Sequence, residues 1–210
     1  MLMKKDSLVL FQGDSITDWG RNYEDPDDLG QGYALMTAAW FSALYPELNV
    51  NFLNRGISGN RTSDLVSRWQ KDCLDLKPDV LSILVGINDT WRRFDQNDPT
   101  TPETFEENYR LLLTEVRQKL NCPIIMGEPF LLPVTEEQKT KWRADLNPKI
   151  DIVRALAQEF NAIYLPYDGI FAAAATKQPS EYWAADGVHP TTAGQALMSR
   201  YWLQAVTAQL

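Results

Sequence analysis

The alternation of apolar and polar stretches along the chain predicts an α/β fold. Five short apolar runs have the length of β-strands and lack the polar alternation of a half-exposed strand, so they suit a sheet that is covered on both faces. These runs are Leu8–Phe11, Val50–Leu53, Asp79–Val85, Pro123–Met126 and Ala162–Leu165. We therefore expect five strands, each separated from the next by a longer segment.

The segments between the predicted strands carry helical patterns. The most regular is Pro102–Leu120, which has apolar residues every three or four positions and a proline suited to the first turn. Further helices are expected over 32–45, over a segment with Leu65, Trp69, Cys73 and Leu76 on one face, over 136–160 with a break or fresh start at Pro148, over 168–175, and after Thr191, which can cap a terminal helix. Loops are expected over 17–31 and, at length, after Asp89.

Strands that alternate with helices predict a three-layer α/β/α sandwich around a five-stranded parallel sheet. Right-handed crossovers place the carboxyl ends of all strands at one edge of the sheet, where ligands bind in this architecture. The segments that leave the strands there carry Ser15, Gly59, Asn88, Asp186 and His189. A chain of 210 residues is long enough for one domain over 1–210, and no second domain is needed.

The charge and the apolar runs narrow the possible partners. A formal charge of −8 argues against nucleic acid and anionic membrane surfaces, both of which repel an acidic protein. The first apolar run, Leu8–Phe11, is too short for a signal-peptide core, and no segment reaches the roughly 20 apolar residues that span a bilayer. We therefore expect a cytoplasmic protein whose partners are small or neutral molecules.

The cysteines and the main acidic cluster do not suggest a metal site. Neither Cys73 nor Cys122 has a metal-ligand companion at short spacing, so both are expected to be free, buried thiols. The acidic run Glu24–Asp28 lacks the ligand alternation of an EF-hand. We interpret it as a solvated loop.

A serine follows the end of the first strand, beside a glycine that allows a tight turn. Taken alone, Gly13-Asp14-Ser15 is typical of an ordinary turn. A serine hydroxyl needs a base to become a nucleophile, and the chain offers a single histidine, His189. Asp186 precedes that histidine by three residues and can accept a hydrogen bond from its other ring nitrogen. Together these residues predict a nucleophile, a base and an orienting carboxylate.

Acyl transfer also needs hydrogen-bond donors for the developing oxyanion. The backbone N–H groups of Ser15 and Gly59 and the side-chain amide of Asn88 could supply three. Gly56 competes with Gly59 for this role, and Gly59 is preferred because it lies at the turn into the following helix. The absence of a Gly-x-Ser-x-Gly stretch argues against the nucleophile elbow of α/β-hydrolases.

Four short blocks of the chain resemble the GDSL, or SGNH, hydrolases, a family of serine esterases with a flavodoxin-like three-layer fold. In the family's order they are Gly13–Thr17, Asn54–Asn60, Gly86–Asp89 and Asp186–Pro190. The resemblance implies Ser15 as nucleophile, Gly59 and Asn88 as oxyanion donors, and Asp186 and His189 as the rest of the triad. It implies no cofactor and no metal. The first block departs from the family name, with Ile16 where the name implies leucine.

The segments 11–18 and 86–92 resemble the intracellular acetylxylan-esterase branch of this family, which removes acetyl groups from xylo-oligosaccharides. This resemblance implies a hydrolase of short-chain, acetyl esters on xylo-oligosaccharides or other acetylated sugars, acting through an acyl-Ser15 intermediate. Trp19, Trp91 and Trp183 fall in loops predicted near the catalytic edge. Their rings could stack on a sugar or enclose an acyl chain, or they could fill gaps beneath the loops.

Other functions stay open on the sequence. A wide apolar acyl pocket would favour a lysophospholipase or short-chain lipase. A metal-dependent phosphohydrolase using Asp14, Asp89, Asp186 and His189 would have a poor first-row metal site, because only one ligand is a histidine. A non-catalytic carbohydrate-binding protein would not need Ser15. The expected partner is thus a small ester, and a homo-oligomer remains open because relatives of this type often self-associate.

Overall fold

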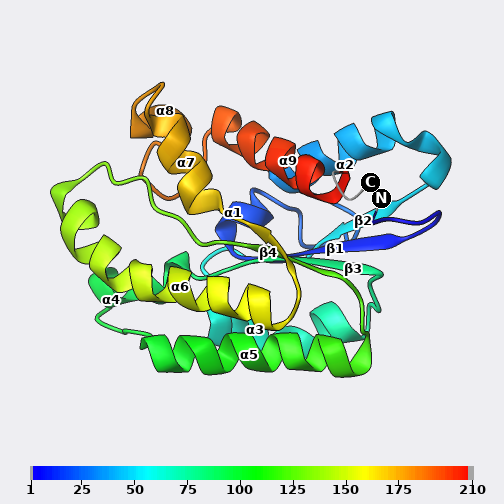
Figure 1. Cartoon of the computed structure of the whole chain (residues 1–210), viewed down its shortest axis with the longest axis horizontal. Helices are drawn as coiled ribbons and strands as arrows, with labels where there is room; N and C mark the ends of the chain where they lie inside the picture. Colours follow the sequence, from blue (N-terminus) through cyan, green and yellow to red (C-terminus); the bar gives the residue numbers. More distant parts are fainter. Residues whose placement is uncertain (1, 208–210) are drawn as a thin grey trace.

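A five-stranded parallel sheet forms the centre of the molecule in the computed structural model, which describes residues 2–207 (Figure 1). The strands are β1 (Leu8–Gly13), β2 (Asn51–Asn54), β3 (Val80–Leu84), β4 (Ile124–Gly127) and β5 (Ile163–Leu165). They pair in the order β2-β1-β3-β4-β5, and every pair is parallel. This confirms the predicted sheet, and the order is that of flavodoxin-like folds.

Helices cover both faces of the sheet, so the predicted three-layer sandwich is confirmed. One layer holds α2 (Tyr33–Leu44), α7 (Tyr167–Ala175), α8 (Ser180–Trp183) and α9 (Thr192–Thr207) (Figure 1). The other holds α3 (Thr62–Trp69), α4 (Ile87–Asp95), α5 (Pro102–Lys119) and α6 (Arg143–Glu159). A single helical turn, α1 (Ser15–Asp18), directly follows β1.

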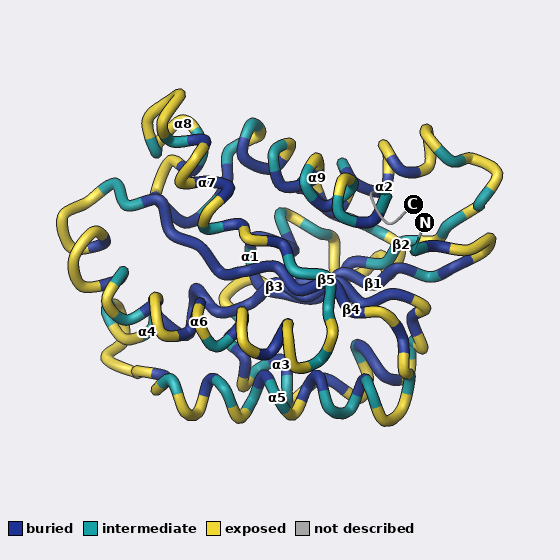
Figure 2. The backbone as a smooth tube through the Cα atoms, viewed as in Figure 1, coloured by how far each residue is buried: buried dark blue, intermediate teal, exposed yellow. Residues whose placement is uncertain are grey.

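The side chains of the central strands alternate between two hydrophobic cores, because each face of the sheet has its own helix layer. In β1, Val9 and Phe11 belong to the core under α2 and α9, whereas Leu10 belongs to the core under α3 and α5. In β3, Val80 and Leu81 divide in the same way. Figure 2 shows the sheet as a buried centre and the outward helix faces as exposed. The unbroken apolar runs in the sequence follow from this double burial.

Most predicted elements lie where the sequence pattern indicates. The predicted helix after the second strand runs through α3 and continues as a wide π turn over Gln70–Leu74. Thr191 caps α9, since its Oγ1 accepts the backbone N–H of Gly194 at 3.4 Å. Cys73 and Cys122 are both free and buried, as expected. None of the described helices is long and apolar enough to cross a membrane.

The long loop predicted after Asp89 is wrong, because the chain forms α4 there. Asn, Asp and Thr near its start are typical of turns, which is why the sequence favoured a loop. The helix is held by tertiary packing instead: Phe94 stacks on Trp142 with ring centroids 5.3 Å apart, and Trp91 meets the same ring at 5.3 Å. The local pattern could not show these contacts.

The break predicted at Pro148 is also wrong, since α6 continues through this residue. A proline inside a helix removes one backbone hydrogen bond and crowds the preceding turn, which costs about 3 kcal/mol. Burial of Leu146, Ile150 and Val153 on the inner face of α6 offsets that cost. The irregular part lies earlier, as a π turn over Gln138–Trp142.

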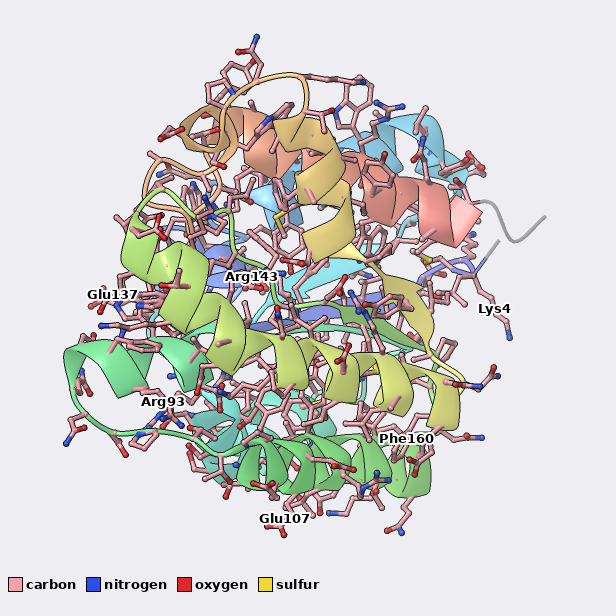
Figure 3. The ribbon with its side chains drawn as sticks, turned by 60° about the vertical axis from the view of Figure 1, so that its left-hand side comes forward. Lys4, Arg93, Glu107, Glu137, Arg143 and Phe160 are labelled. Atoms are coloured by element: carbon pink, nitrogen blue, oxygen red, sulfur yellow. The ribbon has the colours of Figure 1, made fainter. Side chains whose placement is uncertain are left out.

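One half-buried ion pair joins α6 to α7. The guanidinium of Arg143 on α6 binds both carboxylate oxygens of Asp168 on α7, at 2.5 and 2.8 Å. Figure 3 shows Arg143 among the elements, whereas Lys4, Glu107 and Glu137 lie at the periphery. The pair joins a helix below the sheet to one above it.

Candidate active site

The serine predicted as nucleophile stands in a tight turn at the carboxyl end of β1. Only glycine fits at Gly13, because a Cβ there would lie 2.3 Å from a backbone oxygen of β3. Asp14 caps the turn, its Oδ1 accepting the backbone N–H two residues on at 3.0 Å. Trp19 ends it in a left-handed conformation with φ of 39°. Ser15 is therefore the first residue of a one-turn helix, where backbone N–H groups have no partner within the helix.

The segment between α8 and α9 brings the histidine and the aspartate to this serine. Ser15 Oγ lies 2.9 Å from His189 Nε2, and His189 Nδ1 lies 2.6 Å from Asp186 Oδ2. Asp186 Oδ1 also accepts the backbone N–H groups of Val188, at 2.9 Å, and of His189, at 2.7 Å. Carboxylate and imidazole are thus held as one rigid turn, 174 positions from the serine in the chain.

The electrostatics of this turn suit a base that becomes charged. The hydrogen bond that His189 donates to Asp186 raises the pKa of His189 above its ordinary value of 6.5 and outweighs the partial burial of the ring, which lowers it. Partial burial would raise the pKa of Asp186, but the hydrogen bonds from His189 and Val188 lower it to about 2. Asp186 is therefore a carboxylate at neutral pH and stabilises an imidazolium beside it.

Asn88 reaches the same edge of the sheet from the start of α4. The chain enters α4 through Gly86, whose φ of 141° strains any other residue. The Asn88 side chain is only 3% exposed, and its Nδ2 donates to the carbonyl oxygen of Asn60 at 3.1 Å. This hydrogen bond uses one of the two amide protons, and no other acceptor among the described residues binds Nδ2.

The two competing glycines of the second block differ in their hydrogen bonds. The Gly56 N–H is buried and donates to Asn54 Oδ1 at 2.8 Å. Gly59 is exposed with φ of 84°, and among the described residues its N–H has no acceptor. The geometry therefore favours Gly59 over Gly56 as the donor.

Two buried carboxylates, Asp14 and Asp89, lie behind the site. Burial raises the pKa of Asp14 to about 7 and that of Asp89 to about 6. Asp89 accepts the hydroxyl of Thr62 at 2.7 Å and so ties α4 to α3. Within residues 2–207, no group of three or more histidine, cysteine, aspartate or glutamate side chains is placed to hold a metal ion.

An open hollow of about 340 Å³ lies beside the serine. It is lined by Ser15, Trp19, Gly20, Gln31, Ser58 and His189. The ring of Trp19 lies 6.0 Å from the His189 ring, and Trp91 lies 5.7 Å from it on α4. Of the three predicted tryptophans, Trp19 and Trp91 therefore flank the histidine.

Trp183 is placed differently from the other two tryptophans. Its Nε1 donates to the carbonyl oxygen of Ala174 on α7 at 3.1 Å, and its ring packs edge-on against Tyr182. The lining of the hollow includes Trp19 but neither Trp91 nor Trp183, and unlike Trp91, Trp183 has no ring contact with His189 among the described residues. Its contacts are those of a side chain that fills a gap beneath a loop.

Sequence reasoning missed Asp18, Gln31 and Ser58. Gln31 and Ser58 line the hollow, and the Asp18 carboxylate accepts a hydrogen bond from the Ser58 hydroxyl. Asp18 directly follows the first block and falls in the segment predicted as a polar loop. The residue is nevertheless only 3% exposed. A buried carboxylate cannot be told from a solvated one by a local pattern, so the only available signal was its closeness to Ser15.

The chain is similar to known proteins along almost its whole length. Residues 11–197 match the model of the GDSL-like Lipase/Acylhydrolase family. An acetylxylan esterase of Geobacillus stearothermophilus is 32% identical over 206 residues, which cover 94% of this chain and 93% of that protein. The family match over residues 11–197 thus includes all four sequence blocks.

Solved structures agree with this relationship. A crystal structure from Parabacteroides merdae ATCC 43184, described as a GDSL-like lipase, superposes with a TM-score of 0.93 at 40% identity and covers 99% of this chain and 98% of that one. Axe2, an acetylxylan esterase from Geobacillus stearothermophilus, gives a TM-score of 0.91 at 31% identity over 98% of this chain and 96% of its own. Axe2 variants with alanine in place of a serine, an aspartate or a histidine are described as catalytic mutants.

The family match spans most of the chain, and the structural likeness extends over the whole sheet and both helix layers. The chain therefore belongs to the GDSL-like lipase/acylhydrolase family, has the SGNH hydrolase fold, and is a carboxylic ester hydrolase.

Proposed function

We propose that the protein is a serine esterase that removes short acyl groups, acetyl above all, from xylo-oligosaccharides or other acetylated sugars. The observation that carries the proposal is the continuous chain of contacts from Ser15 Oγ through His189 to Asp186, at 2.9 and 2.6 Å. The similarity to an acetylxylan esterase supports the choice of substrate.

The reaction begins with acyl transfer to Ser15. The Ser15 Oγ attacks the ester carbonyl carbon while His189 Nε2 takes its proton, and the carbonyl π electrons move to the carbonyl oxygen. Asp186 stabilises the imidazolium that forms, without taking its proton. The N–H groups of Ser15 and Gly59 and the Nδ2 of Asn88 donate to the oxyanion.

The tetrahedral intermediate then collapses and expels the alcohol. The carbonyl re-forms, the bond to the alcohol oxygen breaks, and His189 gives its proton to that oxygen. Water attacks the acyl-Ser15 ester with the same histidine as base, and a second collapse releases the carboxylic acid and restores the serine. The two half-reactions use the same groups, so none beyond this set is needed.

The size and lining of the hollow support a small substrate. Its volume of about 340 Å³ is at the lower end for small-molecule sites. Gln31 and Ser58 bring polar groups to its wall, and Trp19 adds a flat apolar face. Sugars present hydroxyl groups and apolar ring faces together, so this lining suits them better than it suits a long acyl chain.

The test compares acetyl release from acetylated xylo-oligosaccharides with hydrolysis of nitrophenyl esters of increasing acyl length. Wild type should prefer acetyl, and Ser15→Ala and His189→Ala should each lose most of their turnover while staying folded by circular dichroism. Wild-type turnover in Ser15→Ala would contradict the mechanism. A preference for long acyl chains would favour the lysophospholipase or lipase alternative.

A further inference from the structure

The carboxylate of Asp18 is buried next to the site, and the proposed reaction does not use it. It lies at the end of α1 and is only 3% exposed. Its Oδ2 accepts the Ser58 N–H at 3.0 Å, the Ser58 hydroxyl at 2.6 Å and the Tyr23 hydroxyl at 2.5 Å. Its Oδ1 accepts the Arg21 N–H at 3.0 Å. Two of these four hydrogen bonds come from Ser58, which lies 40 positions away in the chain.

Ser58 belongs to the turn that carries the proposed oxyanion donor. The N–H of Asn60 donates to the carbonyl oxygen of Ile57 at 3.2 Å, and Gly59 has φ of 84°. These are the features of a type II β-turn with Ser58 and Gly59 at its centre. Type I and type II turns differ by a flip of the central peptide, whose N–H is that of Gly59. The direction of the Gly59 N–H is therefore set by the type of this turn.

Other hydrogen bonds hold the two ends of the same turn. The N–H of Ile57 donates to the carbonyl oxygen of Gly13 at 3.2 Å, and Arg68 Nε donates to Asn60 Oδ1 at 2.8 Å. These contacts place the ends but leave the central peptide free to flip. Asp18 accepts both the N–H and the hydroxyl of Ser58, and so fixes the residue directly before this peptide.

We propose that Asp18 is a positioning residue for ester hydrolysis. It holds the turn over 57–60 in the type II form, in which the Gly59 N–H is available to the oxyanion. This inference rests on the proposed function. The Asp18 side chain suits the role because its two oxygens accept hydrogen bonds, and four donors converge on them. An asparagine at this position would turn its NH₂ group toward at least one of those donors.

The experiment measures kcat and KM for nitrophenyl acetate in Asp18→Asn. We expect kcat to fall roughly 10- to 100-fold with KM changed by less than about threefold, because a misplaced donor weakens the transition state more than the bound ester. The matched control is Asp28→Asn. Asp28 also accepts backbone N–H groups within the loop over 17–31, from Asn22 and Gly30, but it does not contact the turn. Its kcat should stay near that of wild type.

A second measurement separates positioning from general destabilisation. Methylboronic acid forms a tetrahedral adduct with a catalytic serine, so its inhibition constant reports on the oxyanion donors. In Asp18→Asn this inhibition constant should rise by the same factor by which kcat/KM falls. Ser58→Ala, which keeps the backbone N–H and loses only the hydroxyl that donates to Asp18, should lose a few-fold in kcat and fold normally.

The outcomes distinguish this inference from the proposed function. If Ser15→Ala keeps wild-type turnover, the proposed function fails and the Asp18 role fails with it. If turnover depends on Ser15 but Asp18→Asn matches Asp28→Asn in kcat and in boronic acid affinity, the positioning role is overturned alone. Should Asp18→Asn fail to fold, wild-type kcat and inhibition in Ser58→Ala would overturn it instead.

Discussion

Asp186 binds His189 twice, with Oδ2 lying 2.6 Å from the ring Nδ1 and Oδ1 accepting the backbone N–H of the same residue at 2.7 Å. The carboxylate thus holds both the position of the residue and the orientation of its ring. With the proton on Nδ1 facing Asp186, Nε2 faces the Ser15 hydroxyl as an acceptor. The tautomer needed by a general base follows from this double contact.

The pH dependence of turnover should report this contact. The base must be neutral to accept the Ser15 proton, so kcat/KM should rise with pH through the pKa of His189, which Asp186 raises above 6.5. Because the pKa of Asp186 is lowered to about 2, its carboxylate stays ionised across that range. In Asp186→Ala the inflection should move to lower pH, and kcat should fall about 10³- to 10⁴-fold. A pH–rate profile for both proteins checks this, and an unmoved inflection would contradict it.

Asn88→Ala should separate catalysis from stability. Loss of an oxyanion donor weakens transition-state binding by about 3 kcal/mol, or roughly 10²-fold in kcat. Loss of the hydrogen bond to the Asn60 carbonyl should lower the free energy of unfolding by only about 1 kcal/mol. Ester turnover and urea unfolding of the same variant measure the two effects. A wild-type kcat would remove Asn88 from the oxyanion site.

Trp91 and Trp183 should differ in their effect on substrate binding. Trp91 lies 5.7 Å from the His189 ring, so Trp91→Ala should raise KM for acetylated xylo-oligosaccharides roughly 3- to 10-fold through lost stacking. Trp183 is bound to Ala174 instead. Trp183→Ala is the matched control and should lower the free energy of unfolding by about 2 kcal/mol at unchanged KM. Equal KM values in the two variants would contradict a role for Trp91 in binding.

Asp14 should make the folded protein less stable as pH rises. Burial raises its pKa from 3.8 to about 7, so between these values the folded state binds more protons than the unfolded state. The contribution of Asp14 to the free energy of unfolding must then decrease from about pH 4 to about pH 7. His189 acts in the same direction, because its raised pKa contributes stability below 6.5 that is lost as pH rises through the folded pKa.

The Asp14→Asn variant isolates the first contribution. Asparagine keeps an oxygen for the cap on the Ile16 N–H, which Asp14 binds at 3.0 Å, but it does not ionise. We expect the loss of stability between about pH 5 and pH 8 to shrink by on the order of 2 kcal/mol. Denaturant unfolding at both pH values measures it, and an unchanged difference would show that Asp14 does not titrate in this range.

Local patterns were sufficient to predict the architecture and to single out Ser15, Asp186 and His189, which the fold brings into contact. Strands buried on both faces must be continuously apolar, so the five strands could be predicted from the apolar runs, and parallel pairing then gathered their carboxyl ends. His189 was the one histidine available as a candidate base, because it is the only histidine in the chain. Nothing beyond residue type and order was needed for either inference.

Tertiary contacts decided the rest of the site. Whether Gly56 or Gly59 has a free N–H depends on the acceptor that Asn54 places beside Gly56. The helix α4 forms where turn residues predict a loop, because Trp142 from a distant segment packs on it. Asp18 is linked to the site only through its hydrogen bonds with Ser58, which lies 40 positions away in the chain. The composition of a segment predicts its own backbone, but the partners of a buried polar group come from segments far along the chain, and folding alone brings them together.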